Sequence, residues 1–232
     1  MRGLLAETST KWAAAVVLAL IAGYLDGYGL LRLGVFASFM SGNTTTAGVS
    51  AGEGNLHAAL PSTVAIAFFF TGSFFGSLLM QSRLHRPHRL IFGIIASMLG
   101  MVALERHVTL NVFFEIATLS LATGMINPAL SKVGGETVSL TFVTGTLKRI
   151  AEHLASAVMH KSSRDSRVAP DSPLRRAAVD ASIWSGFLVG ATIAGLVVSH
   201  AGTWALFPPG VILICFAASG RFDRADSPSI HP

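Results

Sequence analysis

Apolar residues along the chain gather in long runs separated by short polar stretches. A membrane-spanning helix needs about 20 mostly apolar residues, and six runs come close to that length, at residues 12–31, 58–81, 90–104, 109–130, 179–199 and 204–219. The third and sixth runs are short, and Pro208-Pro209 interrupt the sixth. The pattern predicts an all-α protein with six transmembrane helices.

Two further segments, residues 35–51 and 136–160, have intermediate polarity. Clusters of Lys and Arg mark the cytoplasmic loops of membrane proteins. They occur here at Arg2 and Lys11; at Arg83, Arg86 and Arg89; at Lys161, Arg164, Arg167, Arg175 and Arg176; and at Arg221 and Arg224. If all eight segments crossed the membrane, the second cluster would lie outside. If the two intermediate segments enter and return, every cluster lies inside, so we expect two interrupted or re-entrant segments and both termini in the cytoplasm.

The composition agrees with a membrane protein. Hydrophobic residues make up 51% and charged residues 12% of the 232 positions, whereas a soluble domain has about 25% charged residues. The net charge of +5 sits in the connecting clusters rather than on one face, so the expected partner is the lipid bilayer and not nucleic acid. We expect a single transmembrane domain over residues 1–220, a polar cytoplasmic loop at 161–173 and a cytoplasmic tail at 221–232.

The chain repeats itself weakly. The sequence GYLD at 23–26 resembles GMIN at 124–127, and FMSGN at 39–43 resembles FVTGT at 142–146. Each pseudo-repeat, 12–104 and 109–219, would contain three spans and one interrupted segment. Because three is odd, the second copy would be inserted upside down, as in many transporters. Chance is the alternative, since Gly, Ser and Thr are common in membrane helices.

Asp26 lies about 14 residues into the first run, which places it roughly 21 Å into a hydrocarbon layer of about 30 Å. A carboxylate at such depth usually faces a polar cavity, pairs with a partner or carries a proton. A structural hydrogen bond, or a helix end closer to water, is the alternative. Asn127 is the counterpart of Asp26 in the second pseudo-repeat, and Pro128 is expected to kink or end the helix there.

The two interrupted segments carry small polar residues in matching positions. We expect Gly42 to break the first segment and a half-helix to restart at Asn43 or Thr44, with exposed N–H groups and a positive dipole end. The second segment offers similar chemistry, and the two together would form a site for a small anionic or polar solute. Close packing through small residues is the alternative. The candidate substrate-binding residues are Asp26, Ser41, Gly42, Asn43, Thr44, Asn127, Thr144, Gly145 and Thr146.

Other chemistry has little support in the sequence. Metal-ligand spacings, nucleotide-binding loops and hydrolase motifs are absent, and Cys215 is the single cysteine. We therefore expect no metal, no cofactor and no enzymatic activity. Lys148 and Arg149 are expected to anchor at lipid headgroups or to steer anions. His153 has no neighbouring carboxylate in the sequence other than Glu152.

The stretches AGYLDGYGLLRLGVFASFMSGNTTTAG at 22–48 and GMINPALSKVGGETVSLTFVTGTLKRIAEHL at 124–154 resemble the YoaK-like bacterial inner-membrane family, a domain of unknown function. The resemblance extends from about residue 12 to 220. It implies a multi-pass protein of the bacterial inner membrane and an acidic residue at the position of Asp26. Pro128 departs from the family pattern, in which a small or polar residue follows the asparagine.

These observations lead to one hypothesis and one rival. The hypothesis is a transporter or channel for a small anionic or polar solute, with Asp26 as the proton-coupling or gating carboxyl. The rival is a non-transporting scaffold or regulator that acts through its basic cytoplasmic loops. The GxxxG pattern Gly72-Ser73-Phe74-Phe75-Gly76 would suit a homodimer, although it is common in any transmembrane helix.

Overall fold

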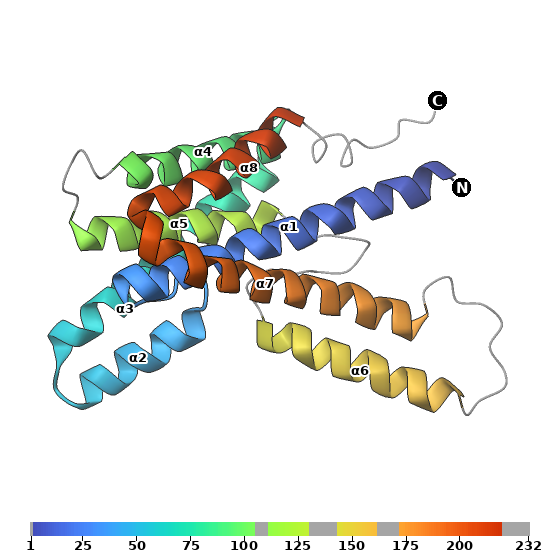
Figure 1. The fold of residues 1–232 in the computed structure, drawn as a ribbon, viewed down its shortest axis with the longest axis horizontal. Helices are drawn as coiled ribbons and strands as arrows, with labels where there is room; N and C mark the ends of the chain where they lie inside the picture. The colour runs from blue at the N-terminus through green and yellow to red at the C-terminus, as the bar shows by residue number, and fades with distance from the viewer. Residues whose placement is uncertain (1, 105–110, 130–142, 162–171, 220–232) are drawn as a thin grey trace.

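A computed structural model describes residues 2–104, 111–129, 143–161 and 172–219 of the chain (Figure 1). These residues are helical apart from short connections. In chain order the helices are α1 (Arg2–Leu33), α2 (Met40–Gly52), α3 (Leu56–Gln81), α4 (Pro87–Ala103), α5 (Val112–Ala129), α6 (Val143–Lys161), α7 (Pro173–Ala201), the 3-10 helix η2 (Gly202–Leu206) and α8 (Phe207–Ser219). The predicted all-α class is therefore confirmed for the described part of the chain.

Five of the six predicted apolar runs lie within helices or helical stretches, and the described part of the run 109–130 contains α5. Four stretches among the described residues are long and apolar enough to cross a membrane, namely Trp12–Leu33, Leu56–Gln81, Val112–Ala129 and Pro173–Ser219. The fourth combines α7 with α8, and α4 is a shorter apolar helix of 17 residues. The structure thus supports several membrane-spanning helices.

The residues at two helix starts explain where α7 begins and why α8 tolerates its prolines. The side chain of Ser172 accepts a hydrogen bond from the N–H of Arg175 (3.3 Å). Pro173 occupies the first turn of α7, where a backbone N–H would have no partner within the helix, so the proline costs no hydrogen bond. α7 consequently starts six residues before the predicted run. Pro208 and Pro209 lie in the first turn of α8 and do not interrupt it, because a helix N-terminus tolerates proline.

The most extensive helix contacts join α1 to α7 and α3 to α5. Both crossings depend on glycine. A Cβ atom at Gly23 would clash with the carbonyl oxygen of Phe187, and a Cβ at Gly190 would clash with that of Leu20. The missing side chains let the two backbones approach each other closely, as small residues do in membrane helices.

The second crossing has the same construction. A Cβ atom at Gly124 of α5 would clash with the carbonyl oxygen of Phe69 in α3, and one at Gly72 would clash with that of Leu121. The hydroxyl of Ser73 also donates to the carbonyl of Gly124 (3.2 Å). Gly72, which was considered for a homodimer face, is thus buried within the protein against α5.

A third pair, α4 and α8, completes the bundle. Phe92, Ile95 and Leu99 follow helical spacing and are buried from one face of α4. The hydroxyl of Tyr24 donates to the carbonyl of Ala205 in η2 (2.6 Å), so α1 is tied to the connection before α8. The core therefore forms around α1, α4, α5 and α7.

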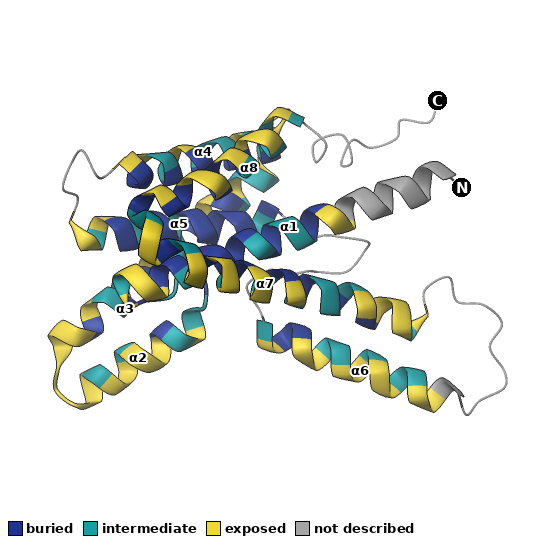
Figure 2. Ribbon diagram, in the orientation of Figure 1, coloured by how far each residue is buried: buried dark blue, intermediate teal, exposed yellow. Residues whose placement is uncertain are grey.

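Two helical hairpins extend from this core. α2 packs on α3, and α6 packs on α7. Figure 1 shows the first hairpin at the lower left and the second at the lower right, at opposite ends of the molecule. Figure 2 shows that α2 and α6 are largely exposed, whereas the buried residues gather at the centre, mainly on α1, α4 and α5.

Several sequence-based expectations lie outside the described residues. They concern residues 105–110, 130–142, 162–171 and 220–232, which include most of the predicted polar loop and all of the predicted tail.

Candidate functional site: the helix starts of α2 and α6

The break in the first interrupted segment lies between α1 and α2, at residues 34–39. Gly34 has a φ of +70°, a conformation that glycine adopts without steric cost. The α2 helix then begins at Met40, so the prediction of a break at Gly42 and a restart at Asn43 or Thr44 is wrong. Gly42 lies within the first turn, where a Cβ atom would come within 2.5 Å of the Phe39 ring.

Asp26 holds this break from the side of α1. Its carboxylate is buried and accepts hydrogen bonds from the backbone N–H (2.5 Å) and the hydroxyl (2.9 Å) of Ser38. A break in a membrane helix leaves backbone groups without partners, and each unsatisfied group costs several kcal/mol in lipid. Asp26 thus makes structural hydrogen bonds, which was the alternative to a solute-binding role. Their partner, Ser38, lies in the loop between α1 and α2.

Asn43 holds the same break from the side of α2. Its side-chain amide donates to the carbonyl of Phe36 (2.7 Å), and its oxygen accepts from the N–H of Phe36 (3.0 Å). From α5, the hydroxyl of Thr123 donates to the carbonyl of Ala37 (2.6 Å). Side chains from three helices therefore bind the six-residue segment that precedes α2. Both the amide nitrogen and the oxygen of the Asn43 side chain take part.

The hydroxyl-bearing residues near the start of α2 are exposed. Ser41 and the three threonines that follow Asn43 all have this character. Each threonine hydroxyl donates to the backbone carbonyl one helical turn earlier, at 2.7 to 3.0 Å. Their oxygens remain able to accept further hydrogen bonds. The start of α2 thus presents a row of accessible hydroxyls made by Ser41, Thr44, Thr45 and Thr46.

The start of α6 has a different chemistry, centred on an ion pair. The Nε and Nη2 atoms of Arg149 lie 3.3 and 3.2 Å from the two carboxylate oxygens of Asp180 in α7. Nη2 also lies 3.4 Å from the hydroxyl oxygen of the buried Thr146. His153, one turn further along α6, places Nε2 3.7 Å from Asp180. A buried carboxylate is thus neutralised by a cation held in two-point geometry.

Sequence reasoning missed Asp180 and assigned Arg149 to lipid headgroups or anion steering. Asp180 is buried, and it gives His153 a carboxylate neighbour that the sequence did not reveal. Two signals were available. Asp180 stands one residue inside a predicted apolar run, and Arg149 and His153 are four residues apart, which places them on one helix face. Lys148 is exposed and pairs with Glu152 (3.2 Å), within α6.

The remaining predicted residues occupy varied surroundings. Thr144 is exposed, Gly145 is buried, and Asn127 is half-buried near the end of α5. Glu115, which is not among the predicted residues, is a further buried acidic residue in the first turn of α5. In the described part of the chain, no three His, Cys, Asp or Glu side chains gather as they would around a metal ion.

The fold and these two helix starts define a helical membrane protein with polar groups buried between its helices. The chain belongs to a family described as a protein of unknown function (DUF1275), whose pattern matches residues 14–219. This match confirms the resemblance drawn from the sequence to a membrane family of unknown function.

One relative is the UPF0700 transmembrane protein RA0705 of Rhizobium meliloti (strain 1021). It is 27% identical over 215 residues, which are 92% of this chain and 87% of the relative. No solved structure matches the chain. Together, the apolar helices and this relative support a multi-pass membrane location.

Proposed function

We propose that the protein is a transporter or channel for a small anionic or polar solute, built from two inverted halves with six membrane-crossing segments. The solute would be held near the starts of α2 and α6. The observation that carries the proposal is the paired glycine crossing, in which matching residues of the two proposed halves meet.

The contact residues of α1 match those of α5 at one constant sequence offset, and those of α3 match those of α7 at another. Gly23 and Gly124 are 101 positions apart (124 minus 23), as are Leu20 and Leu121. Gly72 and Gly190 are 118 positions apart (190 minus 72), as are Phe69 and Phe187. The contact of Gly23 with Phe187 therefore corresponds to that of Gly124 with Phe69, and the same residue types meet in both. Agreement in the partners as well as in the glycines favours a repeat over chance similarity in small residues.

The arrangement of the hairpins supports inversion. The α2–α3 and α6–α7 hairpins point to opposite ends of the molecule, while α2 and α6 both begin toward its middle (Figure 1). The 13 residues of α2 span about 20 Å, less than a hydrocarbon layer of about 30 Å. Half-helices whose N-terminal ends meet near the membrane centre hold anionic groups in several transporter folds.

The side chains support a division of roles. Arg149 would supply positive charge for an anionic solute, with Asp180 as the counter-ion in its absence. Ser41, Thr44 and Thr144 would supply accessible hydroxyls, and Thr146 a buried one. Asp26 and Asn43 would position the start of α2. Protonation of Asp26 would remove an acceptor from Ser38 and loosen that segment, which gives the carboxyl a gating or coupling role.

The proposal is tested with the full chain reconstituted in proteoliposomes. Chloride, nitrate, sulfate, phosphate and acetate are applied in turn while charge movement is recorded, with labelled neutral polar solutes in parallel. We expect at least one solute to move in a protein-dependent way. Arg149→Gln should lower its flux about ten-fold or more, because a charge-assisted contact contributes about 1.5–3 kcal/mol. Lys148→Gln, which alters only the exposed neighbouring pair, is the matched control.

Bulky substitutions separate transport from scaffolding. Ser41→Leu and Thr144→Leu should reduce flux, whereas Thr192→Leu on the exposed face of α7 should not. If no solute in the panel moves, or if these substitutions act no differently from Thr192→Leu, the transport proposal fails.

An unchanged pH dependence of flux in Asp26→Asn would remove the coupling role of Asp26. The rival scaffold instead predicts that replacing residues 163–172 with Gly and Ser abolishes the cellular function.

A further inference from the structure

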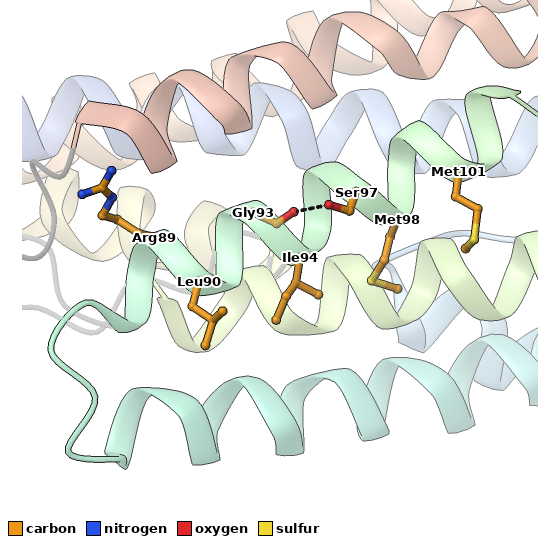
Figure 3. A pocket seen from close by; sticks show the side chains of 7 residues that line it. All are labelled: Arg89, Leu90, Gly93, Ile94, Ser97, Met98 and Met101. Atoms are coloured by element: carbon orange, nitrogen blue, oxygen red, sulfur yellow. Dashed lines mark hydrogen bonds between the residues drawn. The ribbon is translucent and has the colours of Figure 1, made fainter.

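A hollow of about 540 Å³ runs along the outer side of α4, between Arg89 at one end and Met101 at the other (Figure 3). Its apolar lining comes from Leu90, Ile94 and Met98, which Figure 3 shows pointing to the same side of the helix as Met101. Leu90 and Met101 are both more than 40% exposed. Ile94 and Met98 are half-buried and contact the edge of the core, while Leu90 and Met101 lie on its outer side.

Two small residues make the hollow. A Cβ atom at Gly93 would have no other atom within 4 Å, so the glycine leaves open space beside the helix. The hydroxyl of Ser97 donates to the carbonyl of Gly93 (2.9 Å), so its only proton is committed to the helix itself. The hollow therefore has an apolar floor.

The charge at one end of the hollow identifies the chemistry that suits it. Arg89 lines it, and Arg83 and Arg86 lie exposed in the α3–α4 turn close by. Within the described ranges, none of the three makes a hydrogen bond or ion pair through its side chain. Arginine side chains in this position are ready to bind phosphate oxygens.

The length of the hollow fits one leaflet of a bilayer. From residue 89 to residue 101 the helix rises by about 18 Å, and half of a hydrocarbon layer is about 15 Å thick. With the arginines at headgroup level, the apolar part would extend to about the membrane centre. An acyl chain attached to a phosphate headgroup has this distribution of charge and length.

We infer that this hollow binds an anionic phospholipid, with its headgroup phosphate on Arg89 and its neighbouring arginines and an acyl chain along Gly93 and Ile94. A second copy of the chain fits less well. A two-fold axis along the membrane normal would bring the same arginine-rich ends together, and like charges repel. The inference rests on the membrane location and not on the transport proposal.

The test compares dioleoyl-phosphatidylglycerol with dioleoyl-phosphatidylcholine, which has the same acyl chains and no net charge. Native mass spectrometry of the detergent-purified full chain measures how many lipids remain bound. We expect the anionic lipid to be retained preferentially. Arg89→Gln should weaken its binding about five-fold, the effect of one basic residue near an anionic surface. Arg32→Gln, an exposed arginine on α1, is the matched control.

Gly93→Leu and Ser97→Leu should each reduce binding by filling the hollow. Gly195→Leu is their control, since a Cβ atom at Gly195 also meets nothing within 4 Å. All variants must first elute as wild type does from a size-exclusion column. Equal retention of both lipids, or equal effects of Gly93→Leu and Gly195→Leu, would overturn the inference. A dimer that dissociates on Gly93→Leu while lipid retention is unchanged would assign the hollow to a second copy and overturn it as well.

Discussion

Asp26 illustrates how one buried charge can organise a helix break. The carboxylate bonds twice to Ser38, and Asn43 bonds twice to Phe36, so two side chains satisfy the backbone of the segment between α1 and α2. Both side chains are therefore bonded to the segment that precedes α2. Their position near the exposed hydroxyls of α2 makes them suited to control the geometry of a site.

At this scale we predict that Asp26→Ala lowers stability by about 1.5–3 kcal/mol, because the buried N–H of Ser38 loses a charged acceptor. Asp26→Asn should cost less, since the amide oxygen still accepts from that N–H. Thermal unfolding in detergent, followed by size-exclusion chromatography, measures the difference. Ser38→Ala removes only the hydroxyl bond and is the control. If Asp26→Ala unfolds at the wild-type temperature, the carboxylate does not hold the break.

At the scale of elements, glycines decide which helices cross. Lipid-facing surfaces of membrane helices gain nothing from hydrophobic burial alone, so close backbone packing supplies much of the association. Both α1 with α7 and α3 with α5 use this packing. The crossings bring the two hairpins into their positions and thereby set the starts of α2 and α6.

We predict that Gly23→Ala and Gly72→Ala each destabilise the protein by about 1–3 kcal/mol, because the added methyl group meets a backbone carbonyl that cannot move alone. Gly195→Ala should be neutral or stabilising by up to about 1 kcal/mol, since alanine favours the helix and the space is open. The loss of monodisperse protein on heating provides the measurement. Similar effects at all three positions would show that close packing is not what these glycines supply.

At the scale of the whole molecule, the placement of the α2–α3 and α6–α7 hairpins at opposite ends distinguishes an inverted repeat from a parallel one (Figure 1). An inverted repeat requires this arrangement, and a parallel repeat would place both hairpins on one side of the membrane. Because clusters of Lys and Arg mark cytoplasmic loops, we expect the end with Ser172 to lie in the cytoplasm.

We therefore predict that Glu53→Cys in the α2–α3 turn and Ser172→Cys before α7 react with membrane-impermeant maleimide from opposite sides of the membrane. Both positions are exposed. The background protein carries Cys215→Ser, because Cys215 is exposed and would react too. Intact right-side-out vesicles should label only the first, and inverted vesicles only the second. Labelling of both from the same side would exclude the inverted arrangement.

The sequence allowed much of the secondary structure to be predicted and less of the candidate site. Apolar runs located the helices well because their signal is local, but the polar extensions of α1 and α7 carry no such signal. The sequence prediction placed the break before α2 at Gly42, which is wrong. A glycine can occur inside a helix because a neighbouring ring, here that of Phe39, leaves no room for a side chain, and the sequence does not distinguish this from a glycine in a turn. Asp180 was missed because its partner, Arg149, is 31 positions away.

The sequence by itself determined that this is a helical membrane protein, because runs of apolar residues in lipid must satisfy their own backbone hydrogen bonds and do so as helices. The sequence also determined that the chain belongs to the DUF1275 family. The tertiary structure alone decided which glycines meet which carbonyls, that Asp26 binds Ser38 and that Arg149 binds Asp180. These contacts depend on how separate helices cross, and the residues of one helix do not specify the position of the next.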